Sequence, residues 1–113
     1  MHEVGVASGI LKTVLDTAKA NNATTVKEVG ISIGALSGVE QHSLKFAFDA
    51  IKADTIAKDA EMIIENLPAI GLCAECGKES TPETFYSMCS HCGSPTLEIT
   101  SGKEFSISYI DID

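Results

Sequence analysis

The 113-residue sequence contains no arginine and no tryptophan, and aromatic residues make up only 5% of it. All eight basic residues are lysines, against 16 acidic residues, so the formal net charge is −8. Proteins that bind nucleic acids gain much of their affinity from clustered lysine and arginine side chains that neutralise phosphates. The composition therefore argues against a nucleic-acid partner, and the same charge balance disfavours attraction to an anionic membrane surface.

Long hydrophobic runs are also missing. No stretch approaches the roughly 20 apolar residues of a transmembrane helix, and Glu3 stands where a secretory signal peptide would carry basic residues. We therefore expect a cytoplasmic protein, in which thiols stay reduced and the four cysteines act as metal ligands rather than as disulfides. Common catalytic motifs such as G-x-S-x-G, the Walker loop and H-E-x-x-H are absent, so we expect no enzymatic activity.

The hydrophobic content of 44% is nevertheless enough for a core built mainly from aliphatic side chains. Apolar residues at helical spacing predict a helix at about residues 3–20 and a second at about 38–52. Ser37 and Glu40 have the spacing of a capping box at the start of the second helix. Alternating patterns predict strands at residues 29–34, 60–67 and 104–113. Together these elements predict an α+β fold, with two helices packed on one face of a three-stranded sheet.

The stretch from about residue 69 to residue 102 differs from the rest of the chain. It contains all four cysteines, two of the three prolines and little helical periodicity. We interpret it as a zinc-ribbon-like module inserted before the final strand. The predicted organisation is therefore one α/β domain made of residues 1–68 and 103–113, and a metal-binding domain made of residues 69–102.

Two copies of the pattern C-x-x-C-G occur in this module, as CAECG at residues 73–77 and CSHCG at residues 89–93. The C-x-x-C spacing places two thiolates on one tight turn, where both can reach the same ion. Glycine in the next position permits the positive φ that lets backbone amides point at sulfur. Two such turns complete a tetrahedral four-sulfur site. Its predicted ligands are Cys73, Cys76, Cys89 and Cys92.

Zinc is the first candidate for this site, and a closed site with four thiolates has a structural role. Iron is the serious alternative, because paired C-x-x-C-G turns also hold a single iron in rubredoxin-type electron carriers. Disulfides and a dithiol redox centre fit the expected compartment and the matched pair of turns less well. His91, inside the second turn, is expected to be an exposed turn residue rather than a ligand. We expect His42, on the second helix, to be an exposed residue and not a ligand as well.

The chain begins Met-His-Glu and runs directly into the first predicted helix. The free α-amine of Met1, the amide nitrogen of His2 and the imidazole Nδ1 of His2 can form consecutive chelate rings around one ion. Ni²⁺ and Cu²⁺ accept such nitrogens in a square plane, and tetragonal nitrogen and oxygen ligand sets are typical of these ions. Glu3 could fill or orient the remaining position. We interpret the three residues as a shallow metal site, suited to handing metal on.

The chain closely resembles the HypA/HybF family, the nickel metallochaperones of nickel–iron hydrogenase maturation. The resemblance is carried by the MHE start, the IGALSG turn before the second helix, the late pair of C-x-x-C turns and the short β tail. The resemblance covers the whole chain. It implies that Met1, His2 and Glu3 bind nickel, with His2 essential, and that the four cysteines bind structural zinc. It also places Glu40 where the family tends to carry an acid that can approach the nickel site, as an outer-shell residue.

The resemblance further implies two partners: the GTPase of hydrogenase maturation, to which the protein docks, and the hydrogenase large-subunit precursor, to which Ni²⁺ is delivered. Some relatives also supply urease through its accessory proteins. Two other functions stay open on the residues alone. One is a zinc-ribbon adaptor that binds another protein, and the other is a rubredoxin-like electron carrier, which would be red when purified.

Overall fold

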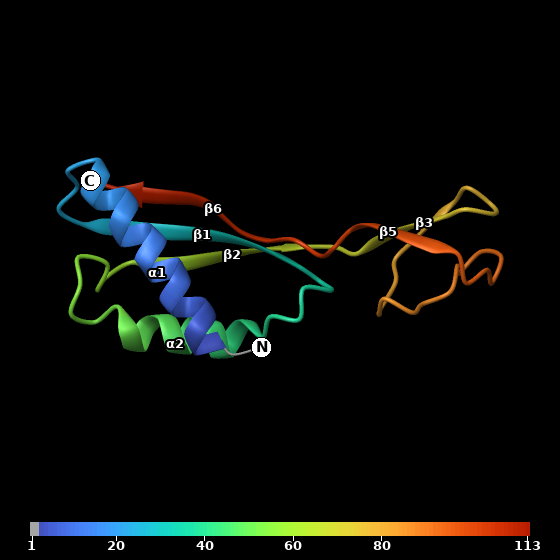
Figure 1. Cartoon of the computed structure of the whole chain (residues 1–113), viewed down its shortest axis with the longest axis horizontal. Coiled ribbons are helices and arrows are strands. Elements are labelled where there is room, and N and C mark those ends of the chain that lie inside the picture. Colours follow the sequence, from blue (N-terminus) through green and yellow to red (C-terminus); the bar gives the residue numbers. More distant parts are fainter. Residues whose placement is uncertain (1–2) are drawn as a thin grey trace. The chain divides into compact units, whose positions relative to one another are not determined.

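The computed structural model describes residues 3–113, so Met1 and His2 lie outside the described residues. The helices are α1 (Glu3–Ala20) and α2 (Gln41–Ile51), and the strands are β1 (Val26–Gly34), β2 (Glu61–Leu67), β3 (Ile70–Cys73), β4 (Glu79–Ser80), β5 (Leu97–Ser101) and β6 (Phe105–Ile112) (Figure 1). The chain divides into two compact units. The first consists of residues 1–31, 39–64 and 107–113, and the second of residues 32–38 and 65–106.

The first unit contains both helices and most of the hydrophobic core. One side of α1 is buried at helical spacing, and α2 buries Leu44, Ala47 and Phe48. The two helices pack against each other, with the start of α1 beside the start of α2 (Figure 1). Phe48 is fully buried, so this one aromatic ring anchors a core that otherwise consists mainly of aliphatic side chains. Neither helix is long and apolar enough, in the described part of the chain, to cross a membrane.

The three-stranded sheet has the order β2-β1-β6, with β1 at its centre. Nearly every residue of β1 is buried, as expected for a strand with neighbours on both sides, whereas most residues of β2 and β6 are half-buried or exposed. The predicted α+β fold of two helices and a three-stranded sheet is confirmed. The prediction placed the start of β1 three residues too late, because the polar residues Lys27 and Glu28 interrupt the alternating pattern there.

The hydrophobic pattern of β6 changes phase near its end, where Tyr109 is followed by Ile110. The structure gives the reason: the Tyr109 ring lies against Gly30, in the space where a side chain on that residue would stand. Its hydroxyl donates a hydrogen bond of 2.9 Å to the Glu28 carboxylate. Tyr109 thus covers β1 where β1 has no side chain of its own, and Ile110 and Ile112 take half-buried positions beyond it.

The start of α2 differs from the predicted capping box. The N-cap is Glu40, with extended backbone angles (φ −89°, ψ 114°), and not Ser37. The Glu40 carboxylate accepts hydrogen bonds from the backbone N–H of His42 (2.6 Å) and from the Ser43 hydroxyl (3.2 Å). Gly38, with a φ of 80°, turns the chain between Ser37 and the helix, which moves Ser37 away from the capping position. A carboxylate is well suited to cap here, since it also interacts favourably with the positive end of the helix dipole.

The second unit contains a second sheet that the sequence analysis did not resolve, with strand order β4-β3-β5. Both pairings are antiparallel, and Gly71 pairs with Ser80 on one side and with Ile99 on the other. These strands contain only two to five residues, so hydrophobic alternation has too little length to be recognised. The first C-x-x-C turn begins where this sheet ends, because Cys73 is the last residue of β3 and pairs with Leu97 of β5.

Candidate metal centre

The four cysteine side chains converge in the second unit. Their Sγ atoms all lie within 4.8 Å of one another, and they form the only such cluster of histidine, cysteine or acidic side chains in residues 3–113. The Sγ of Cys73 is 3.6 Å from that of Cys92, and the Sγ of Cys76 is 3.7 Å from that of Cys89. All four thiols are free, and these separations far exceed the roughly 2.05 Å of a disulfide bond.

The sulfur separations fit a tetrahedral metal ion. Four sulfurs at about 2.3 Å from a central ion stand about 3.8 Å apart, close to the separations of 3.6 and 3.7 Å between opposing turns. Each C-x-x-C turn contributes one sulfur to each short contact, so the two turns face each other across one common centre. The donor set is four soft sulfurs with no oxygen or nitrogen among them, which suits zinc or a single iron.

The two turns have the same hydrogen-bond pattern. In the first, the N–H of Gly77 donates to the Cys73 carbonyl (3.0 Å), and in the second, the N–H of Gly93 donates to the Cys89 carbonyl (2.9 Å). Gly77 and Gly93 have φ values of 74° and 76°, as the sequence predicts. L-residues adopt such angles only with strain. The pattern C-x-x-C-G therefore encodes a local structure that presents both sulfurs of each turn on the same side.

Backbone amides also point at the first sulfur of each turn. The N–H of Cys76 donates to the Cys73 sulfur, and the N–H of His91 donates to the Cys89 sulfur, both at 3.4 Å. These first cysteines are buried, whereas Cys76 and Cys92 are exposed. The site is therefore built on two buried, amide-supported sulfurs and closed from outside by two exposed ones.

The hydrogen bonds divide the four thiols into two kinds. Donation from the backbone N–H of Cys92, and then from that of His91, lowers the pKa of the Cys89 thiol to about 6. The backbone N–H of Cys76 lowers the pKa of Cys73 in the same way. At Cys92 the backbone N–H of Ser94 acts in the same direction, but the hydrogen bond with the neighbouring Cys73 thiol, together with the other cysteines, outweighs it and raises the pKa to about 12. The pKa is thus lowered at the two cysteines whose sulfurs accept backbone N–H groups, and these hydrogen bonds favour the thiolate form that a metal ion requires.

Two contacts around the second turn involve β4. The His91 ring Nε2 lies 3.0 Å from the carbonyl oxygen of Glu79, so its imidazole faces the backbone and does not join the sulfur cluster. Ser80 is buried, and its hydroxyl lies 3.8 Å from the Cys89 sulfur. Sequence reasoning missed Ser80, since a single serine nine residues before a cysteine carries no recognisable signal.

Of the predicted nickel-site residues, Met1 and His2 lie outside the described residues, and Glu3 is the first residue of α1. The Glu3 carboxylate oxygen Oε2 accepts a hydrogen bond of 3.2 Å from the backbone N–H of Glu40. The structure therefore brings Glu3 and Glu40 together, although 37 positions separate them in the sequence. The contact uses the backbone of Glu40, while its carboxylate caps α2.

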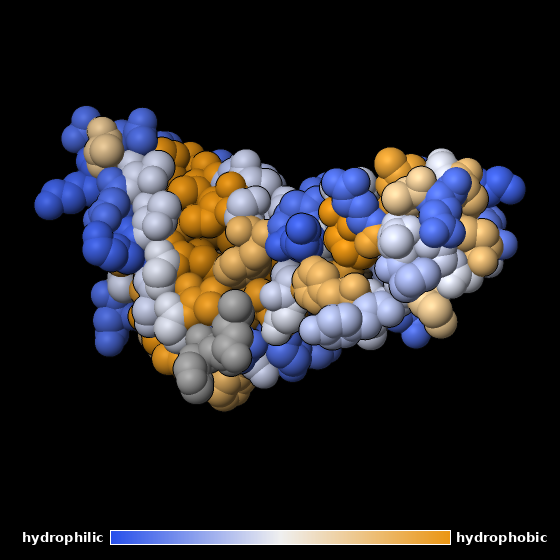
Figure 2. Space-filling view, turned by 45° about the vertical axis from the view of Figure 1, so that its right-hand side comes forward, coloured by the Kyte–Doolittle hydropathy of each residue, from blue (hydrophilic) through white to orange (hydrophobic). Residues whose placement is uncertain are grey.

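A largely apolar groove of about 760 Å³ begins at Glu3 and continues along α2, lined by Val4, His42, Ser43, Phe46, Ala47, Ala50 and Ile51. Val4 and Phe46 are 62% and 79% exposed. Figure 2 shows hydrophobic residues gathered in a band on the surface of the unit that carries both helices. His42, predicted to be an exposed helical residue, is exposed and lies in this groove.

Comparison with known proteins gives a consistent result over the full length of the chain. A family model described as hydrogenase/urease nickel incorporation, metallochaperone, hypA matches residues 1–112. The chain is 39% identical to the hydrogenase maturation factor HypA of Aquifex aeolicus over 113 residues, which cover all of this chain and 98% of that protein. It is 37% identical to the hydrogenase maturation factor HypA of Chlorobaculum parvum, with both chains covered completely.

Solved structures give the same likeness. The solution structure of the Ni metallochaperone HypA from Helicobacter pylori is similar with a TM-score of 0.68 and 26% sequence identity, over 99% of this chain and 97% of that chain. A second solution structure of a HypA protein is similar with a TM-score of 0.71 and 26% identity, over 100% of this chain and 97% of that chain.

Proposed function

The chain belongs to the HypA family, the nickel metallochaperones of hydrogenase maturation, and we propose that it binds Ni²⁺ at its N-terminus and delivers the ion for hydrogenase maturation. The position of Glu3 carries this proposal. Its carboxylate lies against the start of α2, and it follows His2 directly in the sequence. Glu3, the third of the proposed ligand residues, therefore has a defined place in the fold.

The proposed nickel ligands are the α-amine of Met1, the amide and imidazole nitrogens of His2, and Glu3. Glu40 acts as an outer-shell residue. Its N–H donates to the Glu3 carboxylate, and its own carboxylate fixes the first turn of α2. Glu40 would therefore hold the orientation of Glu3 rather than contact the ion. A set of nitrogens with one carboxylate suits Ni²⁺ in tetragonal geometry.

The cysteine site is proposed to hold structural zinc through Cys73, Cys76, Cys89 and Cys92. The sulfur separations and the buried, amide-supported thiols support this assignment. Zinc bound by four thiolates has no open position for substrate, and such a site contributes on the order of 10 kcal/mol to folding in small metal-binding domains. We propose that residues 69–102 form this zinc-binding domain and that residues 1–68 with 103–113 form the nickel-binding domain.

Delivery requires ligand exchange and no covalent chemistry, so the protein is proposed to act without catalysing a reaction. The partners would be the maturation GTPase and the hydrogenase large-subunit precursor, with urease accessory proteins as further candidates, all in the cytoplasm. The family description, which names both hydrogenase and urease, supports these partners. The acidic chain, with its net charge of −8, does not favour a nucleic acid or an anionic membrane among them.

The nickel site can be tested by titrating untagged, zinc-loaded protein with Ni²⁺ and following the heat of binding and the visible absorption. His2→Ala should abolish binding of one Ni²⁺ per chain without unfolding the protein. His91→Ala is the matched control, since its ring lies against the Glu79 carbonyl in the other unit. Nickel binding that survives His2→Ala, or that is lost equally in both variants, would contradict the proposed site.

The zinc assignment needs a separate measurement, which is elemental analysis of the purified protein. One zinc per chain and no colour are expected. A red protein that contains one iron per chain would instead favour the rubredoxin-like electron carrier, because iron in a four-sulfur site absorbs visible light whereas zinc does not.

A further inference from the structure

Ser80 is one of the three buried polar residues in the described part of the chain, with 8% of its surface exposed. It ends the two-residue strand β4, which pairs with β3 at Gly71. This pairing brings the serine from the exit of the first C-x-x-C turn to the second turn. Its hydroxyl then lies 3.8 Å from the sulfur of Cys89, in the geometry of an O–H donor to sulfur.

The orientation of the Ser80 hydroxyl is constrained by a second contact. Its oxygen accepts a hydrogen bond of 3.2 Å from the backbone N–H of Ser90. With one lone pair engaged in this way, the hydroxyl proton can be directed at the Cys89 sulfur or at the Ser90 hydroxyl oxygen, which lies 3.1 Å away. A thiolate is the stronger acceptor of the two, because a hydrogen bond to an ionised group is stronger than one to a neutral group.

Glu79, the residue before Ser80, also connects β4 to the second C-x-x-C turn. The Glu79 carbonyl oxygen lies 3.0 Å from the His91 ring Nε2, so both residues of β4 contact the second turn. The Cys89 sulfur also accepts the N–H of His91. Cys89 thus receives backbone donors from its own turn and a side-chain donor from a distant strand. For Cys73, the corresponding buried cysteine, the side-chain contacts are with the other cysteines.

We propose that Ser80 is a positioning residue of the four-cysteine site, whose hydroxyl donates to the Cys89 thiolate and slows loss of the bound ion. The inference rests on the proposed metal site and adds a residue to it. Four thiolates around a dication carry an excess negative charge, and a hydrogen-bond donor to sulfur stabilises that charge. Removal of such outer contacts commonly weakens metal binding by 10- to 100-fold.

The test uses Co²⁺ as a probe, because thiolate-bound Co²⁺ has a charge-transfer band that reports on the sulfur orbitals. Full-length protein is loaded with one Co²⁺ per chain, and release to a chelator is followed at constant pH. In Ser80→Ala the band should move to longer wavelength, since sulfur without the donor holds its electrons less tightly. Release should become roughly tenfold faster.

Ser94→Ala is the matched control. Ser94 is also buried, at 5% exposed, and follows the second turn directly, but its hydroxyl pairs with that of Thr96 at 2.6 Å rather than with sulfur. The band of Ser94→Ala should stay at the wild-type wavelength. Ser80→Thr keeps the hydroxyl and should restore both the band and the release rate. If Ser80→Ala does not fold, Ser80→Gly, which also removes the hydroxyl, provides the readout.

Three outcomes would overturn the inference. Equal effects in Ser80→Ala and Ser94→Ala would indicate general loosening of the second unit. An unchanged band in Ser80→Ala, or a shifted band in Ser80→Thr, would show that the hydroxyl does not act on the sulfur. Wild-type protein that takes up no Co²⁺ with thiolate bands would refute the four-cysteine site itself, which distinguishes failure of the proposed function from failure of this inference.

Discussion

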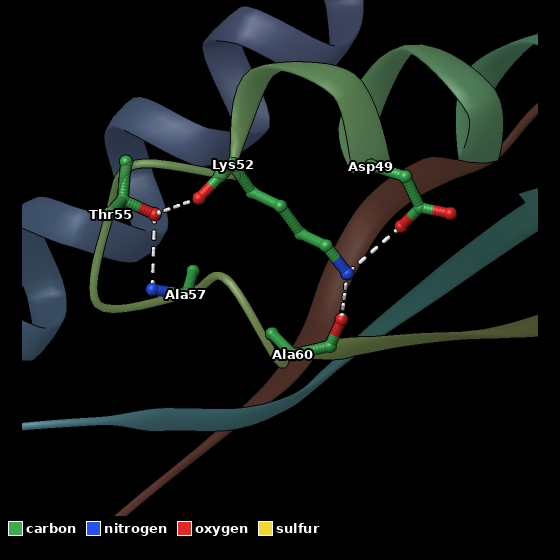
Figure 3. Close-up of polar contacts among 5 residues, drawn as sticks. All are labelled: Asp49, Lys52, Thr55, Ala57 and Ala60. Carbon is green, nitrogen blue, oxygen red and sulfur yellow. Dashed lines mark hydrogen bonds and ion pairs between the residues drawn. The ribbon is translucent and has the colours of Figure 1, made fainter.

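Lys52 holds the end of α2 to the segment that leads into β2 (Figure 3). Its ammonium group donates to the carbonyl oxygen of Ala60 at 2.5 Å and lies 2.9 Å from the Asp49 carboxylate. It also stands 5.6 Å from the centre of the Phe48 ring. The Lys52 side chain is only 12% exposed, so these contacts are shielded from water, although Asp49 itself is 66% exposed. We predict that Lys52→Met, which keeps the side-chain length and removes the charge, destabilises the first unit.

The magnitude follows from the three contacts. A hydrogen bond from a charged donor contributes about 1.5–3 kcal/mol. Ala60 is buried, so loss of the Lys52 ammonium group leaves its carbonyl oxygen without this hydrogen bond in a site shielded from water. The contact with the Phe48 ring adds about 0.5–1 kcal/mol. The ion pair with Asp49 contributes less than about 1 kcal/mol, because that carboxylate is exposed. Since methionine keeps the packing of the side-chain stem, no further loss is added, and we expect Lys52→Met to cost about 2–5 kcal/mol.

The assay is urea unfolding of metal-loaded protein, followed by far-ultraviolet circular dichroism, because both helices belong to the first unit. Asp49→Asn is the control and should cost less than about 1 kcal/mol. Two results would refute the reasoning. A change below about 0.5 kcal/mol in Lys52→Met would mean that the buried carbonyl contact contributes little, and an equal loss in Asp49→Asn would place the stabilisation in the ion pair.

Four further predictions concern other parts of the chain. The Thr24 hydroxyl and adjacent N–H groups lower the pKa of Asp113 below its usual 3.8. The resulting stabilisation of the folded protein is present above pH 3.8 and is lost as the pH falls through the lower folded-state pKa. In Asp113→Asn, the free energy of unfolding measured by acid titration should therefore lack the decrease that the wild-type protein shows in this pH range. Gly93→Ala should cost about 1–2 kcal/mol in urea unfolding because of its positive φ, whereas Gly9→Ala, with open space around it, should stabilise α1 by about 0.5–1 kcal/mol. Cys76→Ala should release the metal ion and increase amide hydrogen exchange in residues 70–103; normal metal content would contradict a closed four-cysteine site.

Elements with long, periodic patterns were predictable from the sequence. The predicted bounds of α1 agree with the structure, because its buried residues repeat at helical spacing over the whole of Glu3–Ala20. The start of α2 was less predictable, since the choice between Ser37 and Glu40 as N-cap depends on the backbone turn at Gly38. The short strands of the second unit were missed because their pairing depends on register between distant segments and not on a local pattern.

The same distinction applies to the site. The convergence of the four cysteines was predictable, because C-x-x-C-G encodes a local turn, and two such turns with matching hydrogen bonds suffice to bring the sulfurs together. The contact of Ser80 with Cys89 was not, since it arises from the pairing of β4 with β3. Glu40 was placed near the predicted nickel site by resemblance to the family, but only the structure shows that its backbone N–H makes the contact with Glu3.

The two proposed metal sites differ in the chemistry that transfer and retention require. In the cysteine site, four sulfurs are supplied by two rigid turns, and two of them are buried and hydrogen-bonded to backbone amides. An incoming ligand would have to displace one of these sulfurs, which favours retention. The proposed N-terminal site is drawn from one end of the chain and fixed to the fold at Glu3. In the proposed site, a partner would replace the nitrogen ligands one at a time without disturbing the core. Separation of soft sulfur ligands from nitrogen and oxygen ligands also lets zinc and nickel be held by different donor sets.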